Sequence, residues 1–271
     1  GNYNTVVGDE AGTAITTGDH NTGVGYGAGK AVTTGIKNTF VGSLTGDANT
    51  TGDNNTAIGQ GALSANTTAD NNTAVGLNAL VANTTGADNT STGFSSSVSN
   101  TTGSNNAVFG KEAFYTNTTG SSNTAIGQWA LYYNTTASNN TAVGKSSLES
   151  NTTGASNTAS GFESLKANTT GIRNTALGYQ ALLLATTASN NTAVGAFAGD
   201  STTTGINNTF IGYDTAPANT TGDNNVSLGS GSLHANTTAD NNTAIGYSAL
   251  YANTTGSNNV SVGYQSSAAN T

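Results

Sequence analysis

Apolar residues recur along this chain at fixed places in a unit of 17 residues, and small polar residues fill most of the rest. The consensus reads G-x-N-N-T-A-V-G-x-x-A-L-x-A-N-T-T, counted from Gly1. It occurs sixteen times without insertion or deletion, the last copy being one residue shorter. A period of 17 is too short for a helix pair, which needs about 30 residues. Thr, Asn and Gly are also poor helix formers. The period therefore predicts an all-β fold, a parallel β-solenoid with one coil per repeat.

Two segments of each coil have the residue pattern of a strand. In the fourth coil, Thr56–Gly59 alternates Thr and Ile on one face with Ala on the other, and Ala62–Ala65 places Leu and the second Ala on one face. The Asn- and Gly-containing segments between them are expected to form corners, because these residues tolerate the left-handed backbone conformation.

The apolar positions predict a thin core. We expect the aliphatic residue at the seventh position and Leu at the twelfth to stack into ladders, while the variable ninth, tenth and thirteenth positions face solvent. The seventh-position residues are Val7, Ile58, Val75, Ile126, Leu177, Ile211, Leu228 and Ile245. The twelfth-position residues are Leu63, Leu80, Leu131, Leu148, Leu165, Leu182, Leu233 and Leu250.

Three polar or small positions barely vary between coils, which predicts structural ladders. An Asn amide can donate to and accept from the next coil, and Thr hydroxyls can bond along the stack. In the first coils the candidate ladder residues are Asn4, Asn21, Asn38, Asn55 and Asn72 at the fourth position, Gly8, Gly25, Gly42, Gly59 and Gly76 at the eighth, and Thr16, Thr33, Thr50 and Thr67 at the sixteenth.

Domain organisation follows from the unbroken period. We expect residues 1–271 to form a single continuous solenoid whose coils pair as parallel strands about 4.8 Å apart. The first and last coils both carry the consensus, so the ends are expected to be uncapped sheet edges, as in a longer array or in subunits that stack end to end.

Charge and composition exclude several classes of partner. The net charge is −8, with only six Lys and Arg, so no basic surface is available for nucleic acid. No apolar run of about 18 residues exists, which argues against membrane insertion. Cysteine is absent, so disulfides and thiolate metal sites are excluded.

The sequence offers no convincing catalytic, cofactor or metal site. His20 and His234 occupy different repeat positions in distant coils, and no carboxylate pair stands out, so we expect no enzyme and no cofactor. Asp53, Asp70, Asp223 and Asp240 have oxygens suited to Ca²⁺, but one carboxylate per corner is a weak ligand set. We expect these Asp residues to accept backbone hydrogen bonds instead.

Two further candidate functions involve the Asn-Thr-Thr segment. It fits the acceptor pattern for N-glycosylation, which makes Asn49, Asn66, Asn83, Asn100, Asn117 and Asn134 candidate sites, although glycans one coil apart would crowd. The Thr ranks beginning at Thr16 and Thr17 suggest ice binding by analogy with other Thr-rich solenoids. Neighbouring residues of a strand point to opposite faces, however, so the two ranks are not expected to share a plane.

The phrases Asn55-Thr-Ala-Ile-Gly-Gln-Gly-Ala-Leu-Ser-Ala-Asn-Thr-Thr and Asn242-Thr-Ala-Ile-Gly-Tyr-Ser-Ala-Leu-Tyr-Ala-Asn-Thr-Thr carry a family resemblance. They resemble repeats of phage tail-fibre-like and bacterial surface fibre proteins and, more distantly, the head repeats of trimeric autotransporter adhesins. The resemblance covers the whole chain and implies a left-handed solenoid, often a homotrimer, on a fibre outside a cell or virion. From these 271 residues we expect a departure from those proteins, without their coiled-coil stalk, membrane anchor or C-terminal chaperone domain.

Repeat and resemblance together predict a structural subunit of an extracellular fibre or filament, located on a cell surface, in a secreted filament or on a virion. We expect it to self-associate, end to end or as a homotrimer, and to have an adhesive role toward a cell-surface or glycan receptor. Exposed aromatic residues are the candidate contacts, although they are equally well explained as tolerated surface residues. These are Tyr26, Phe94, Tyr132, Tyr179, Tyr213, Tyr247 and Tyr264. A receptor-binding phage fibre shaft and an ice-binding protein are the alternatives.

Overall fold

The computed structural model describes residues 1–269 and confirms the β-solenoid. Within these residues it contains sixteen strands of three residues each and no helix. The strands are β1 (Thr5–Val7), β2 (Thr22–Val24), β3 (Thr39–Val41), β4 (Thr56–Ile58), β5 (Thr73–Val75), β6 (Thr90–Thr92), β7 (Ala107–Phe109), β8 (Thr124–Ile126), β9 (Thr141–Val143), β10 (Thr158–Ser160), β11 (Thr175–Leu177), β12 (Thr192–Val194), β13 (Thr209–Ile211), β14 (Val226–Leu228), β15 (Thr243–Ile245) and β16 (Val260–Val262).

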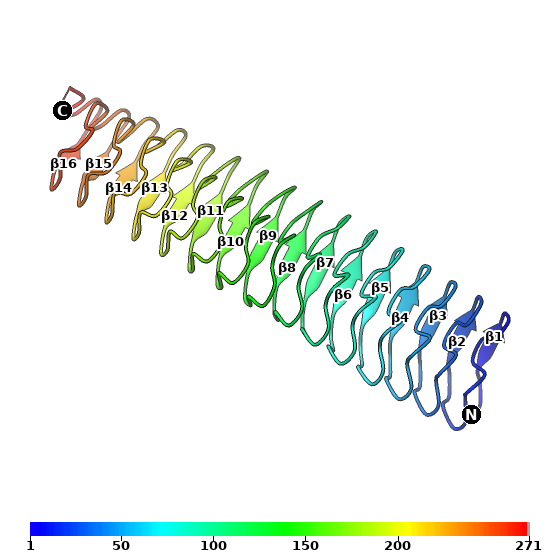
Figure 1. The fold of residues 1–271 in the computed structure, drawn as a ribbon. Helices are drawn as coiled ribbons and strands as arrows, with labels where there is room; N and C mark the ends of the chain where they lie inside the picture. Colours follow the sequence, from blue (N-terminus) through cyan, green and yellow to red (C-terminus); the bar gives the residue numbers. More distant parts are fainter. Residues whose placement is uncertain (270–271) are drawn as a thin grey trace. The chain divides into compact units, whose positions relative to one another are not determined.

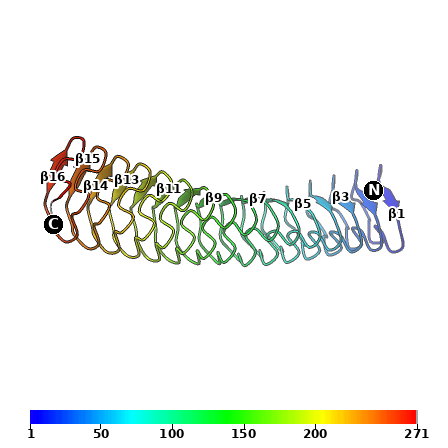
Figure 2. The same ribbon diagram turned by 90° about the horizontal axis from the view of Figure 1, so that it is seen from above.

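The coils form two compact units, Gly1–Ser138 with β1–β8 and Asn139–Thr271 with β9–β16. Inside each unit, every strand pairs in parallel with its neighbour in the sequence, and equivalent repeat positions face each other. Thr56 pairs with Thr73 in the first unit, and Thr158 pairs with Thr175 in the second. Successive coils of one unit therefore lie side by side, as both views show (Figure 1, Figure 2). A single continuous domain and a left-handed coil stay predictions.

The core is thinner than the sequence pattern suggested. Its usual members are a small residue at the sixth position, a small residue at the eleventh and, in half of the coils, a Leu at the twelfth. In the fourth coil these are Ala57, Ala62 and Leu63, each completely buried. The prediction for the twelfth position is confirmed.

The prediction for the seventh position was wrong. Ile58 is 42% exposed and Leu228 is 43% exposed, because the alternation of the strand turns positions five and seven outward when position six faces the core. The Asn at the fourth position is buried on the same side as the sixth. Because alternate residues of an extended segment share a face, the buried Asn at the fourth position already indicates that the seventh residue faces solvent.

The predicted second strand is absent from the described coils. The segment from the ninth to the fourteenth position is a chain of turns in which residues at the tenth and twelfth positions have positive φ, as in Gly61 (68°) and Leu63 (55°). Their N–H groups reach neighbouring coils: Gly61 N donates to Ser43 O (3.0 Å) and Leu63 N to Ala79 O (3.0 Å). The expected left-handed corner occurs at the third position, as at Asn54 (φ 56°).

The Asn ladder at the fourth position joins each coil to the next through side chain and backbone together. Asn55 Oδ1 accepts the backbone N–H of Asn72 (3.0 Å), and Asn55 Nδ2 donates to Ala69 O (2.8 Å) in the same neighbouring coil. The contact repeats back to Asn4, whose Oδ1 accepts from Asn21 N (2.8 Å). Asn21, Asn38, Asn55 and Asn72 are at most 3% exposed. Each amide thus satisfies a buried donor and a buried acceptor that no strand pairing reaches.

Thr and Gly complete the contact between coils. The hydroxyls of Thr16, Thr33, Thr50 and Thr67 each donate to the carbonyl oxygen of the Thr one coil ahead, at 2.9–3.3 Å. At the eighth position, Gly59 has φ 131°, and a Cβ there would lie 2.5 Å from Gly76 O. Gly8, Gly25, Gly42 and Gly76 have the same conformation. Only Gly allows this close approach of two coils.

The Asn ladder makes a prediction about stability. Replacing Asn72 by Ser leaves Asn89 N and Gly86 O, its partners in the next coil, without hydrogen bonds, since a Ser hydroxyl is too short to reach both. We expect the free energy of unfolding to fall by about 2–4 kcal/mol, measured by chemical denaturation. The same change at the exposed Asn105 is the control, because Ser122 and Ser156 already occupy that position with positive φ, and should have an effect within about 0.5 kcal/mol. Equal losses would contradict the role of the ladder.

Candidate interaction surface

The side chains at positions five and seven form one continuous surface in each unit, which we call the outer row. Both point away from the core on the same side of the strand, with Thr mostly at the fifth position and Val, Ile or Leu mostly at the seventh. Eight parallel strands about 4.8 Å apart give each unit a row roughly 35 Å long.

The outer row carries no charge, and its seventh-position residues are mostly aliphatic. In no coil is either position occupied by Asp, Glu, Lys, Arg or His. The seventh-position residues Ile58, Phe109, Ile126, Leu177, Ile211 and Leu228 are 37–43% exposed. Single exposed apolar residues are ordinary, but a row of aliphatic side chains that recurs in successive coils is a candidate interaction surface.

Aromatic residues near the ninth position form a second exposed feature in the second unit. Phe162 stacks on Tyr179 with ring centroids 5.4 Å apart, and Phe197 lies edge-on to both Tyr179 (5.3 Å) and Tyr213 (6.2 Å). Tyr179 is 46% and Tyr213 is 59% exposed. Of the aromatic contacts predicted from sequence, Tyr247 and Tyr264 also stack on each other (5.4 Å), and Tyr132 stacks on Tyr115 (5.0 Å). Tyr26 and Phe94 lie exposed in the first unit.

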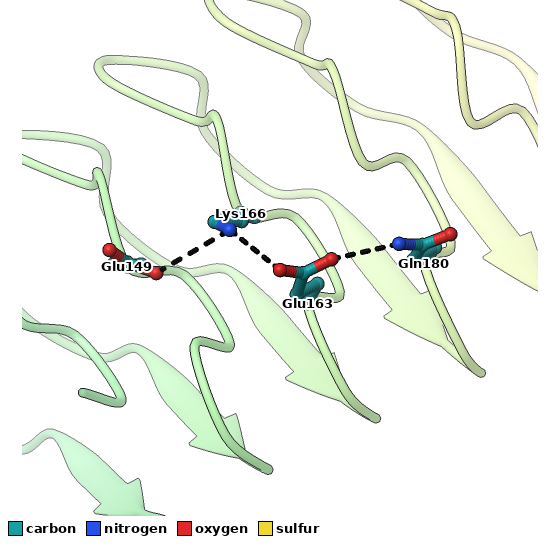
Figure 3. A network of polar contacts seen from close by, with 4 residues as sticks. All are labelled: Glu149, Glu163, Lys166 and Gln180. Atoms are coloured by element: carbon teal, nitrogen blue, oxygen red, sulfur yellow. Dashed lines mark hydrogen bonds and ion pairs between the residues drawn. The ribbon is translucent and has the colours of Figure 1, made fainter. Parts of the chain in front are cut away.

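Charged side chains at the tenth and thirteenth positions pair within a coil and between neighbouring coils. Lys166 binds Glu163 (2.6 Å) and lies 3.9 Å from Glu149, while Gln180 Nε2 donates to the other oxygen of Glu163 (2.8 Å) (Figure 3). The hydrogen bond from Lys166 lowers the pKa of Glu163, and the bond from Gln180 lowers it further. These part-buried contacts link the turns of three successive coils.

The corner Asp residues have the structural role predicted for them. Asp53 Oδ1 accepts the backbone N–H of Ile36 (2.8 Å), and Asp70 Oδ1 accepts that of Asp53 (2.7 Å). Asp223 and Asp240 repeat the pattern with Ile206 and Asp223 as donors. Within residues 1–269, no three His, Cys, Asp or Glu side chains are grouped so that they could hold a metal ion. His20 stacks on Tyr3, and His234 lies 3.4 Å from Asp214.

The candidate glycosylation sites lie inside the coil. Asn49, Asn66, Asn83, Asn100, Asn117 and Asn134 are at most 1% exposed. Asn66 Nδ2, the atom to which a glycan would be attached, donates to Asn49 Oδ1 (2.7 Å) and Ala69 O (3.0 Å). The fifteenth position is thus a second Asn ladder. A glycan on this atom does not fit the folded coil, so the motif match does not mark an exposed acceptor.

The two Thr ranks considered for ice binding differ in environment. Thr33, Thr50 and Thr67 are half-buried, and their hydroxyls donate to backbone carbonyls, whereas Thr34, Thr51 and Thr68 are exposed. Thr also recurs at the fifth position, in the outer row. The residue that shares its face, at the seventh position, is usually aliphatic, so the outer row does not present two adjacent ranks of Thr.

Comparison with known proteins adds no relative to this description. A scan against protein-family models finds no match, and a search of the curated proteins finds none. The class of the protein therefore rests on its own geometry, a β-solenoid repeat protein, and the resemblance to surface fibre repeats stays an expectation. Across the described coils, no helix has the length and apolar character needed to cross a membrane.

Burial of the fifteenth position makes a prediction about glycosylation. An oligosaccharyltransferase supplied with its lipid-linked donor should leave the folded protein unmodified, because Nδ2 of residues such as Asn66 and Asn117 is enclosed and hydrogen-bonded. The same enzyme should modify a peptide that contains one Asn-Thr-Thr segment. Intact mass spectrometry measures both, and glycans on the folded chain would contradict the burial.

A partly buried carboxyl makes a prediction about pH. Burial raises the pKa of Asp200 above its ordinary value, and the nearby charge of Asp214 contributes in the same direction. The native carboxyl therefore binds its proton at a higher pH than the unfolded one, so the free energy of unfolding should decrease as pH rises through the range just above pH ~4. Asp200→Asn should remove this part of the pH dependence in denaturation curves, while the exposed control Asp88→Asn should not. Identical pH profiles for the protein and Asp200→Asn would refute it.

Proposed function

We propose that the chain is a structural subunit of an extracellular fibre and that it associates side by side with further copies of itself through the outer row. The observation that carries the proposal is the charge-free aliphatic face of the seventh position, with Ile58, Ile126 and Ile211 between 37% and 42% exposed. Covering such a surface removes apolar area from water, which favours association.

A second copy of the same chain suits this surface because of its period. The outer row presents one Thr and one aliphatic side chain per coil, so a row with the same spacing meets it in register along a whole unit. Its profile is also uneven, since Phe109 stands next to the smaller Thr92, and uneven profiles favour interdigitating side chains over a flat lattice such as ice.

The ladders support the mechanical part of the proposal. Within each unit, the fourth-position Asn, the sixteenth-position Thr and the strands bind every coil to its neighbours, so most of the hydrogen bonding runs between coils. A fibre subunit of this kind resists local opening because one coil cannot leave without breaking contacts on both sides. The aromatic row from Phe162 to Tyr213 is the face we assign to an adhesive contact with a cell-surface or glycan receptor.

Charge placed in the outer row tests the proposal. The variant Ile58→Lys, Ile126→Lys, Ile211→Lys should be monomeric, because association would bury three ammonium groups without partners. The unchanged protein should form a defined oligomer at micromolar concentration. Analytical ultracentrifugation measures both masses, and electron microscopy shows whether filaments form.

The matched control places the same charges outside the outer row. Asn54, Asn105 and Asn224 are exposed third-position residues, and Lys37 and Arg173 already occupy that position in other coils. Their triple Lys variant should associate like the unchanged protein. A monomeric unchanged protein contradicts the proposal, and thermal hysteresis by that monomer would favour ice binding. Filaments that persist in the outer-row variant would indicate end-to-end stacking instead.

A further inference from the structure

Two coils depart from the consensus core in a matched way. Phe occupies the sixth position only at Phe40 and Phe210, where half of the coils have Ala. In the same two regions the Leu of the twelfth position is replaced by small residues, Gly29 and Gly46 around Phe40, and Gly199 and Ala216 around Phe210. Large and small residues have therefore exchanged places across the core.

The geometry explains the exchange. Phe40 is 1% exposed and Phe210 is completely buried. A Cβ added to Gly29 would lie 2.9 Å from Phe40 Cδ2, and one added to Gly46 would overlap the same ring. A coil this narrow holds either a Leu at the twelfth position or a ring at the sixth, because interiors are close-packed and overfilling is destabilising.

The pair in the second unit is formed between neighbouring coils. Gly199 belongs to the coil before Phe210, and a Cβ added to Gly199 would lie 2.5 Å from Phe210 Cδ2 and 3.2 Å from Leu182 Cδ2. Gly199 therefore lies between the ring and the consensus Leu182 of the preceding coil. A coil with Leu at this place would collide with the ring of Phe210.

Polar substitutions in the core are matched between coils as well. Thr215 lies opposite two Ser residues of the next coil, with its Oγ1 2.7 Å from Ser227 Oγ and 3.1 Å from Ser232 Oγ. All three residues are completely buried. In place of Thr215, an Ala would leave both Ser hydroxyls without this partner, which is costly in a buried site.

The same rare residues occur twice, 170 residues apart. Gly29, Phe40, Thr45 and Ser91 correspond to Gly199, Phe210, Thr215 and Ser261, and Thr is found at the eleventh position only at these two places. Residues outside the core differ between the two stretches: Lys30 corresponds to Asp200, and Ser43 corresponds to Tyr213. The Phe–Gly pair and the Thr thus occur in both stretches, whereas the Ser partners of Thr215 correspond to Ala57 and Ala62, and Thr45 Oγ1 donates to Gly59 O (2.6 Å).

We propose that these matched residues fix the order in which coils stack. The strands, the Asn ladders and the Thr ladder are nearly identical in every coil, so by themselves they would allow a coil to pair with a wrong neighbour. The Phe–Gly pair and the Thr–Ser cluster restrict that freedom, because the thirteenth coil (residues 205–221) fits on a coil with a small twelfth residue and not on one of the eight coils with Leu there. This device acts against misregistered stacking within or between chains and is independent of the fibre proposal.

Removal of one whole coil tests the proposal without changing the phase of the repeat. Deletion of residues 188–204 places the Phe210 coil on the coil of Leu182, whereas deletion of residues 171–187 leaves Phe210 on Gly199 and puts Leu165 where Leu182 was. Both chains have the same length. We expect the first deletion to have a Tm roughly 5 °C below that of the second, measured by calorimetry.

A second substitution makes the result specific to the ring. In the chain lacking residues 188–204, Phe210→Ala should raise the Tm, since it restores the consensus Ala–Leu core, while in the intact chain it should lower the Tm by roughly 10 °C by opening a cavity. This reversal of sign supports the proposal. Equal Tm values for the two deletions, or a lower Tm from Phe210→Ala in both chains, would overturn it. If the chain lacking residues 188–204 folds only when it also carries Phe210→Ala, the proposal is supported. If it does not fold with Phe210→Ala either, while the chain lacking residues 171–187 does fold, the proposal is overturned.

Discussion

The buried Asn at the fourth position is the interaction on which the rest of the structure depends. A three-residue strand pairs few backbone groups, so most N–H and C=O groups of a 17-residue coil need partners elsewhere. The Asn amide supplies two of them at once, as when Asn55 binds both Asn72 N and Ala69 O. Because that amide must face inward, the sixth residue also faces inward, and the fifth and seventh face solvent.

This constraint leaves a narrow core with little room for variation. Two Asn ladders share the interior with small residues and, in half of the coils, with a twelfth-position Leu such as Leu63. Any larger residue has to be matched by a smaller one nearby, as Phe40 is by Gly46. Stability therefore comes mainly from contacts between neighbouring coils, and apolar side chains that do not fit the interior form the outer row. The surface proposed for association is a direct consequence of the way in which the interior is filled.

The period, the coil and the ladders were predictable from the sequence because each invariant residue has one dominant physical reason. Leu at the twelfth position was correctly placed in the core. Val and Ile at the seventh position were wrongly placed in the core, because their hydrophobicity favours burial but the inward-facing Asn at the fourth position turns them toward solvent. The second strand was also wrong, because Leu63 takes a positive φ that Leu rarely adopts. The acceptor motif at Asn66 gave no sign of burial, since its pattern is local and its hydrogen bonds reach another coil.

The most direct measurement of this account is amide hydrogen exchange at the backbone N–H of the fourth-position Asn residues. That N–H lies outside the strands, and in the structure its acceptor is the side chain of the preceding coil, as for Asn38, Asn72 and Asn191. The account predicts protection of these amides as strong as that of the strand residues two places on, such as Ala74 and Ala193. Exchange at the rate of an unfolded peptide, while the strands stay protected, would contradict it.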